Sequence, residues 1–130
     1  MIKREFEVWL RFASRDLRAA RILHGSGDLL NALYHLQQAA EKSLKAVIVF
    51  HSIPVSHRQF RTHNLEYLVA ILKRHGVDIP NDLKGIGILT DYAFTTRYPD
   101  DYVPVSEEEY DEAYSVAIRV YEWAKKVVES

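Results

Sequence analysis

Apolar residues recur every three or four positions along five segments of the chain, which is the spacing of helices that bury one face. The five segments cover residues 6–23, 29–51, 62–76, 83–93 and 106–128. No segment alternates apolar and polar residues for long enough to predict a strand. Helices joined by short connections pack as antiparallel neighbours. The pattern therefore predicts an all-α fold, an up-and-down antiparallel bundle of four long helices plus a short or broken fifth.

Turn-forming residues mark where the predicted helices begin and end. Residues 25–28 are Gly-Ser-Gly-Asp, which suits the end of the first helix and the cap of the second. Residues 52–62 follow the second helix and indicate a polar loop. In the fourth segment, Gly85 and Gly87 each weaken a helix by about 1 kcal/mol. We therefore expect that segment to bend or to begin late.

Composition narrows the class of protein without naming its activity. The chain has 130 residues, which suits one domain over 1–130, and its lack of cysteine excludes disulfides and thiolate metal sites. Its 17 basic and 18 acidic residues give a net charge of −1, so binding to nucleic acid or lipid would need a local patch. No apolar run reaches the ~20 residues of a membrane span, and the first residues do not resemble a signal peptide. We expect a cytoplasmic protein that does not enter a membrane.

The chain lacks the usual signatures of metal, cofactor and nucleophile sites. Its six histidines are scattered, with no pair at the spacing of a helical zinc site. No strand-borne serine turn and no glycine-rich phosphate loop is present either. We predict no metal site and no cofactor.

Arginines form a stripe on the first predicted helix. Arg4, Arg11, Arg15 and Arg18 are separated by seven, four and three residues, which places them on one face. Such a stripe suits a phosphate backbone or an acidic partner. It is equally compatible with a solvated face paired with acids, for example those of residues 107–112. The sequence leaves both interpretations open.

The second predicted helix carries two polar rows among alanines. Gln37, Glu41 and Lys45 stand at successive i, i+4 positions, and Gln38 and Lys42 form a parallel row. An exposed Glu–Lys pair at this spacing contributes only a few tenths of a kcal/mol. Between alanines on a central helix, the rows indicate either a buried network or one wall of a polar groove.

Residues 92–102 concentrate an arginine, three tyrosines and two aspartates around Pro99. Proline restricts the residue before it, so the helix should end near this point, and loops at helix ends commonly carry function. Arg97 could bind a phosphate in two parallel hydrogen bonds, or it could brace the loop against neighbouring aspartates. The tyrosines suit either base stacking or packing in a core or a dimer interface.

Four segments together resemble the HEPN family, the higher eukaryotes and prokaryotes nucleotide-binding domain. They are Trp9 and Ala13 with Asp16-Leu17, the run QQAAEKSLKA at 37–46, THNL at 62–65, and RYP at 97–99. The resemblance covers nearly the whole chain in the same order. It implies a four- or five-helix bundle that is commonly dimeric. It also implies a small nucleotidyltransferase as protein partner, in several cases within a toxin–antitoxin pair.

Many HEPN domains are metal-independent ribonucleases that use an arginine and a histidine with four to six residues between them, near the start of the last helix. Counting forward from Arg97, residues 102–104 are tyrosine, valine and proline, and no histidine follows His75. Cleavage at a 2′-hydroxyl needs a group that exchanges protons near neutral pH, which histidine does and tyrosine does not. Whether the chain is an enzyme stays open, and the missing histidine argues against it.

These patterns predict a non-catalytic HEPN module that binds a nucleotide or RNA and forms a homodimer. The predicted phosphate-binding residues are Lys42, Lys45, Arg97 and Tyr98. Lysine and arginine would bind the phosphate, and tyrosine would stack on a base. No residue is predicted to be catalytic.

Two other functions remain as alternatives. The first is a ribonuclease toxin in which Arg97 works with a displaced base, either His63 or Tyr102. Arg58 and His63 also have four residues between them, but they precede the third helix, so we treat that spacing as coincidence. The second is a structural interaction subunit whose partner covers the arginine stripe.

Overall fold

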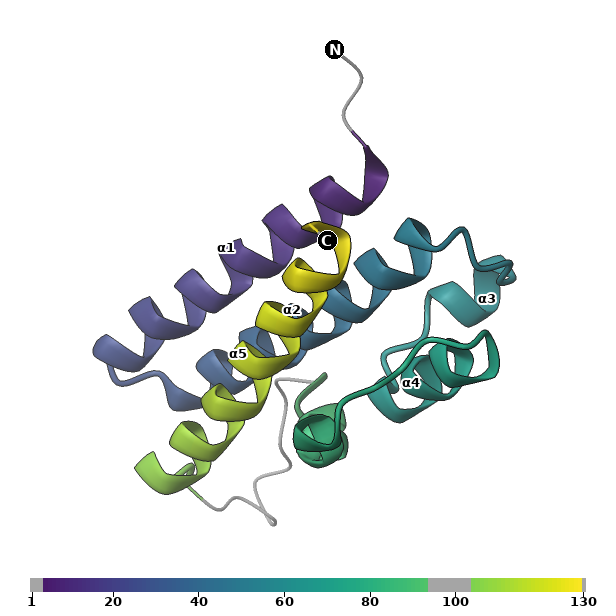
Figure 1. Cartoon of the computed structure of the whole chain (residues 1–130). Coiled ribbons are helices and arrows are strands. Elements are labelled where there is room, and N and C mark those ends of the chain that lie inside the picture. The colour runs from purple at the N-terminus through teal and green to yellow at the C-terminus, as the bar shows by residue number, and fades with distance from the viewer. Residues whose placement is uncertain (1–3, 94–103, 130) are drawn as a thin grey trace.

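The computed structural model describes residues 4–93 and 104–129, and helices make up most of both ranges (Figure 1). The helices are α1 (Glu5–Gly25), α2 (Leu29–Phe50), α3 (His57–Phe60), α4 (Leu65–Arg74), the 3₁₀ helix η1 (Asn81–Ala93) and α5 (Glu107–Glu129). These two ranges contain no strand, so the predicted all-α fold is confirmed. In the same part of the chain, none of the helices is both long and apolar enough to cross a lipid bilayer.

The three long helices α1, α2 and α5 form the body of the bundle. In Figure 1, α1 runs against α2 and against α5, and α4 and η1 lie together beside them. The turn between α1 and α2 is the one that the sequence predicts. Gly27 takes a positive φ of 84°, and the Asp28 side chain accepts a hydrogen bond from the Asn31 amide at 3.2 Å. A glycine and an N-cap aspartate are therefore sufficient to reverse the chain here.

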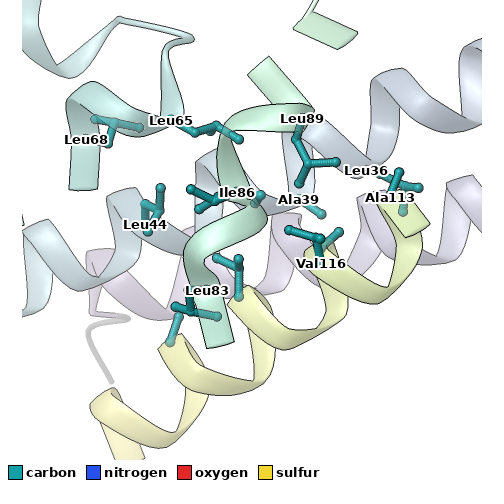
Figure 2. Packing of buried hydrophobic residues seen from close by; sticks show 14 of the residues in the cluster. Leu36, Ala39, Leu44, Leu65, Leu68, Leu83, Ile86, Leu89, Ala113 and Val116 are labelled. Carbon is teal, nitrogen blue, oxygen red and sulfur yellow. The ribbon is translucent and has the colours of Figure 1, made fainter. Parts of the chain in front are cut away.

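Helix α2 lies at the centre of the core, and 13 of its 22 residues are buried. Figure 2 shows side chains of α2, α4, η1 and α5 meeting in one apolar cluster, which includes Leu44, Leu68, Leu89 and Val116. Small residues let neighbouring helices approach α2 closely. Buried Ser43 donates its hydroxyl proton to the Ala39 carbonyl at 2.7 Å, so it carries no unsatisfied polar atom.

Two segments differ from the expected pattern. The predicted loop at 52–62 contains the single turn α3, closed by a capping box in which Ser56 and Gln59 bind each other's backbone amides. The fourth segment is wound as a 3₁₀ helix rather than an α-helix. Its glycines let it lie close to its neighbours. A Cβ at Gly87 would lie 2.7 Å from a Glu66 carboxylate oxygen, and one at Gly85 would lie 3.4 Å from Val116.

Candidate functional site

Glu41 is the centre of a buried polar network on α2. Its carboxylate accepts hydrogen bonds from Lys45 Nζ at 2.7 Å, His63 Nδ1 at 2.8 Å and Gln37 Nε2 at 3.1 Å. Gln38 in turn donates to Gln37 Oε1 at 2.7 Å. Gln37 is fully buried, and Glu41 and Lys45 are each 4% exposed. Of the two interpretations of this polar row, the structure shows the buried network. We call Gln37, Glu41, Lys45 and His63 the Glu41 cluster.

Aromatic rings close the Glu41 cluster on the side of Lys45. The Lys45 ammonium lies 5.8 Å from the centre of the Trp9 ring and 5.4 Å from that of Phe60. The two rings meet edge to face at 5.4 Å. A cation placed over aromatic faces and bound to a carboxylate is stabilised without water. The structure therefore places this predicted phosphate ligand inside the fold, joining α1, α2 and α3.

A second carboxylate on α1 organises a similar but more open group. Asp16 accepts from Lys42 Nζ at 2.7 Å and from His35 Nδ1 at 2.8 Å. The side chain of Asp16 is 10% exposed, that of Lys42 23% and that of His35 31%. We call these three residues the Asp16 cluster. Of the two predicted lysine ligands, Lys42 is therefore the one that reaches the surface.

Lys42 also belongs to a cationic surface around one exposed ring. The Phe12 ring is 37% exposed, and the side-chain cations of Arg15, Lys42 and Arg11 lie 5.6, 5.9 and 6.0 Å from its centre. We call these four residues the Phe12 surface. Three cations around one ring make a local positive patch on a protein with a net charge of −1.

The arginine stripe of α1 is solvent-exposed along its length. Within the two described ranges, Arg4, Arg11, Arg15 and Arg18 form no ion pair. Of the acids at 107–112, Glu107 instead binds His24 Nε2 at 2.7 Å. The stripe arginines therefore keep exposed guanidinium groups that the acids of a partner can reach.

A separate cluster joins the last turn of α1 to the start of α5. His24 stacks on the Tyr110 ring at 4.2 Å, and Arg21 donates to the Tyr114 hydroxyl at 3.1 Å. Burial, followed in size by the Tyr114 hydroxyl, raises the pKa of the Tyr110 hydroxyl above its ordinary value. These contacts fix the two helix ends against each other and leave no open site.

The predicted loop residues Arg97, Tyr98 and Tyr102 lie outside the residues that the structure describes, so their roles remain predictions. Tyr92 precedes them in the chain and lies within the described part. Its hydroxyl donates to Glu109 Oε2 at 2.7 Å, and its ring packs against the core. Tyr92 therefore serves to hold η1 against α5.

His63 has the geometry of an oriented proton-transfer group. Glu41 binds its Nδ1, and Gln37 donates to its backbone carbonyl at 3.1 Å, yet the side chain is 54% exposed. A carboxylate can only accept hydrogen bonds, so the Nδ1 atom of His63 must carry the proton. In the neutral imidazole the lone pair is then on Nε2. The pairing of Glu41 with His63 was not visible in the sequence, because 22 residues separate the partners.

Metal binding receives no support from the described residues, among which no three histidine or acidic side chains form a group that could hold an ion. His24, His35 and His63 each pair with one carboxylate instead. Such pairs fix the imidazole ring without supplying the three or four ligands that a zinc ion needs.

The chain matches the HEPN domain family over residues 6–127. The chain therefore belongs to the HEPN domain family, and the resemblance seen in its sequence is confirmed. Two solved structures agree. The crystal structure of ST0689, an archaeal HEPN homologue, superposes with a TM-score of 0.75 at 30% identity, covering 98% of this chain and 99% of that one. The crystal structure of TT1696 from Thermus thermophilus gives 0.79 at 28% identity, covering 95% and 98%.

A curated relative from Methanocaldococcus jannaschii bears the name "Putative toxin MJ1304". The two chains are 27% identical over an alignment of 103 residues, and the alignment covers 74% of this chain. The match covers 64% of the length of that relative.

Proposed function

We propose that this chain is a HEPN module that binds a nucleotide or nucleic acid without cleaving it. On this proposal it is a cytoplasmic homodimer and the accessory or toxin–antitoxin partner of a minimal nucleotidyltransferase. Membership of the HEPN family supports the binding role, and the name of the Methanocaldococcus jannaschii relative supports the toxin connection. The missing histidine after Arg97 supports the non-catalytic part.

The observation that carries the binding role is the position of Lys42. Asp16 holds its ammonium at the surface beside the exposed Phe12 ring, and Arg11 and Arg15 add charge to the same patch. Phosphate oxygens bind such fixed cations through charge-assisted hydrogen bonds. Arg97 and Tyr98 are proposed to complete the site, whereas Lys45 is buried and bound to Glu41.

Titration calorimetry with ATP, GTP and a short RNA tests this site. Loss of one charge-assisted bond costs about 1.5–3 kcal/mol, so Lys42→Gln and Arg97→Ala should each weaken binding at least about tenfold. Lys73→Gln, which removes an exposed lysine from α4, is the matched control and should leave affinity unchanged. Absence of binding by the unaltered protein to all three ligands would overturn the proposal.

The protein partner and the dimer need a separate measurement. Co-expression with a nucleotidyltransferase encoded beside this chain in its own genome should yield a stoichiometric complex. Sedimentation analysis of the chain alone should give twice the monomer mass of 15.1 kDa. A monomer, or two proteins that sediment independently, would contradict these parts of the proposal.

A metal-independent ribonuclease is the second candidate, and the orientation of His63 by Glu41 is the observation that favours it. Nε2 of His63 would take the proton of a 2′-hydroxyl, whose oxygen attacks the phosphorus. The bond between phosphorus and the 5′-oxygen would break, and the 5′-oxygen would take a proton from water, giving a 2′,3′-cyclic phosphate. RNA incubated with EDTA should then be cut, and His63→Gln should abolish the cutting. RNA that stays intact with concentrated protein would remove this candidate.

A further inference from the structure

A groove of about 460 Å³ lies between α1 and α5. Its apolar lining residues, each partly buried, are Phe6, Leu10, Tyr121 and Val128. Three exposed cations also line it, namely Arg4, Arg11 and Lys125. We call this feature the α1–α5 groove. A cavity with apolar walls and exposed cations is the form of site that holds an apolar side chain and an acid of the same partner.

The lining residues of this groove carry more positive than negative charge. Glu7 and Glu129 are the acids among its lining residues, against three cations. Arg15 and Arg18 extend the positive stripe along α1, and within the described ranges the four stripe arginines have no ion pair. The positive charge therefore extends well beyond the groove.

The stripe also ends in an exposed apolar residue. Ile22 is 62% exposed and lies eighteen residues after Arg4, which is five full helical turns, so both residues share one face of α1. An aliphatic side chain gains nothing from a nucleic-acid backbone, but it contributes when another apolar side chain covers it. This face therefore combines apolar positions with arginine, a residue type that is enriched in protein–protein interfaces.

We propose that the α1–α5 groove and the adjoining arginine stripe bind an acidic amphipathic helix of a partner protein. The rises between successive stripe arginines are roughly 10, 6 and 4.5 Å, and acids three, four and seven residues apart on an opposing helix have the same rises. Apolar side chains of that helix enter the groove between Leu10 and Val128. This is the helix-in-groove mode of recognition, with charge selecting the partner.

A nucleic acid fits this surface less well. Two of the four apolar lining residues, Leu10 and Val128, are aliphatic and offer no ring for a base to stack on. The ring of Phe6 already lies under the Arg4 guanidinium at 5.8 Å. The groove shares Arg11 with the cationic patch beside the proposed nucleotide site, but neither Lys42 nor Phe12 lines it, and its use requires no nucleotide.

Selection from a displayed library tests the proposal without assuming a sequence. The library is a single helix of about 18 residues with randomised surface positions, and the target is the full chain. We expect enriched helices to carry Asp or Glu three and four residues apart beside an apolar anchor. Enriched helices that are neutral or basic, or a selection that enriches no helix, would overturn the proposal.

Variants then locate the binding. Exposed charges change affinity only modestly, so Arg4→Gln with Arg11→Gln should weaken the best peptide about tenfold, mainly through a slower association. Val128→Glu, which places a carboxylate in the groove, should weaken it further without affecting the helical circular dichroism signal. The matched control is Arg58→Gln with Arg61→Gln, two exposed arginines near α3, and it should retain full affinity.

Three results of these measurements would contradict the proposal. Equal losses of peptide affinity in the groove variant (Arg4→Gln with Arg11→Gln) and in the control variant would show unspecific charge attraction. Full affinity in both groove variants would place the peptide elsewhere. A 12-nucleotide RNA that displaces the peptide, and is weakened by the same groove substitutions, would assign the face to nucleic acid.

Discussion

Two carboxylates in this bundle make almost the same contacts and yet are expected to behave differently. Asp16 and Glu41 each bind one lysine at 2.7 Å and one histidine at 2.8 Å. The side chain of Lys45, held by Glu41, is 5% exposed, whereas that of Lys42, held by Asp16, is 23% exposed. The two clusters differ in how far their lysines are exposed to water, rather than in the distances of these ion pairs.

Access to water decides what each cluster contributes. A buried pair loses about as much free energy by leaving water as it gains by attraction, so it stabilises little over apolar residues but is costly to break. A pair near the surface costs less to break, because water replaces the lost partner. The Glu41 cluster therefore holds α1, α2 and α3 in one arrangement, while the Asp16 cluster presents a charge to solvent.

The largest effect should come from Glu41→Ala. It leaves the Lys45 ammonium buried without its carboxylate, which lowers the free energy of unfolding by about 3–5 kcal/mol. Urea unfolding followed by circular dichroism measures this loss. A cost below that of Asp16→Ala would contradict the assignment of Glu41 as the structural member of the two.

Replacing both charges should recover most of that loss. Glu41→Leu with Lys45→Met removes the pair and keeps apolar volume, so we expect stability within about 1 kcal/mol of the original protein. The single Glu41→Leu variant, measured beside it, completes the comparison. If the double variant is as unstable as the single one, charge burial is not the cause of the loss.

Asp16→Ala should cost less, about 1–2 kcal/mol, because Lys42 and His35 both reach water when their partner is removed. The same change should also weaken nucleotide binding, since the Lys42 ammonium is no longer held beside Phe12. Unfolding and calorimetry on one preparation separate the two effects. Unchanged ligand affinity would show that Asp16 does not position Lys42 for binding.

The smallest effects should come from the histidines. His63→Gln and His35→Gln each remove one hydrogen bond from a partly exposed ring, so each should cost about 1 kcal/mol or less. Thermal unfolding detects a change of that size as a shift of a few degrees. A much larger loss for His63→Gln would mean that its ring is structural, and the ribonuclease test would then require another variant.

Local features of the fold could be predicted from single segments. The stripes of apolar residues located the helices, and Gly25 to Asp28 located the first turn, because spacing and capping depend on neighbours in sequence. The single turn α3 was missed because four residues show no periodicity. The glycines indicated that the fourth segment would be irregular, but its 3₁₀ winding depends on packing against α4 and α5.

The candidate site shows the limit of the sequence more sharply. Its pattern singled out the polar rows of α2 and the arginines of α1, since i, i+4 and i, i+7 spacing follow from helix geometry alone. The sequence pattern could not show which of Lys42 and Lys45 is exposed to solvent. Both lie on the same helix, and they differ only in the neighbouring residues that cover them. The rings of Trp9 and Phe60, both distant in sequence, cover Lys45, whereas Asp16 holds Lys42 near the surface. Local spacing is therefore a property of the sequence, whereas burial and long-range pairing arise only when the helices pack.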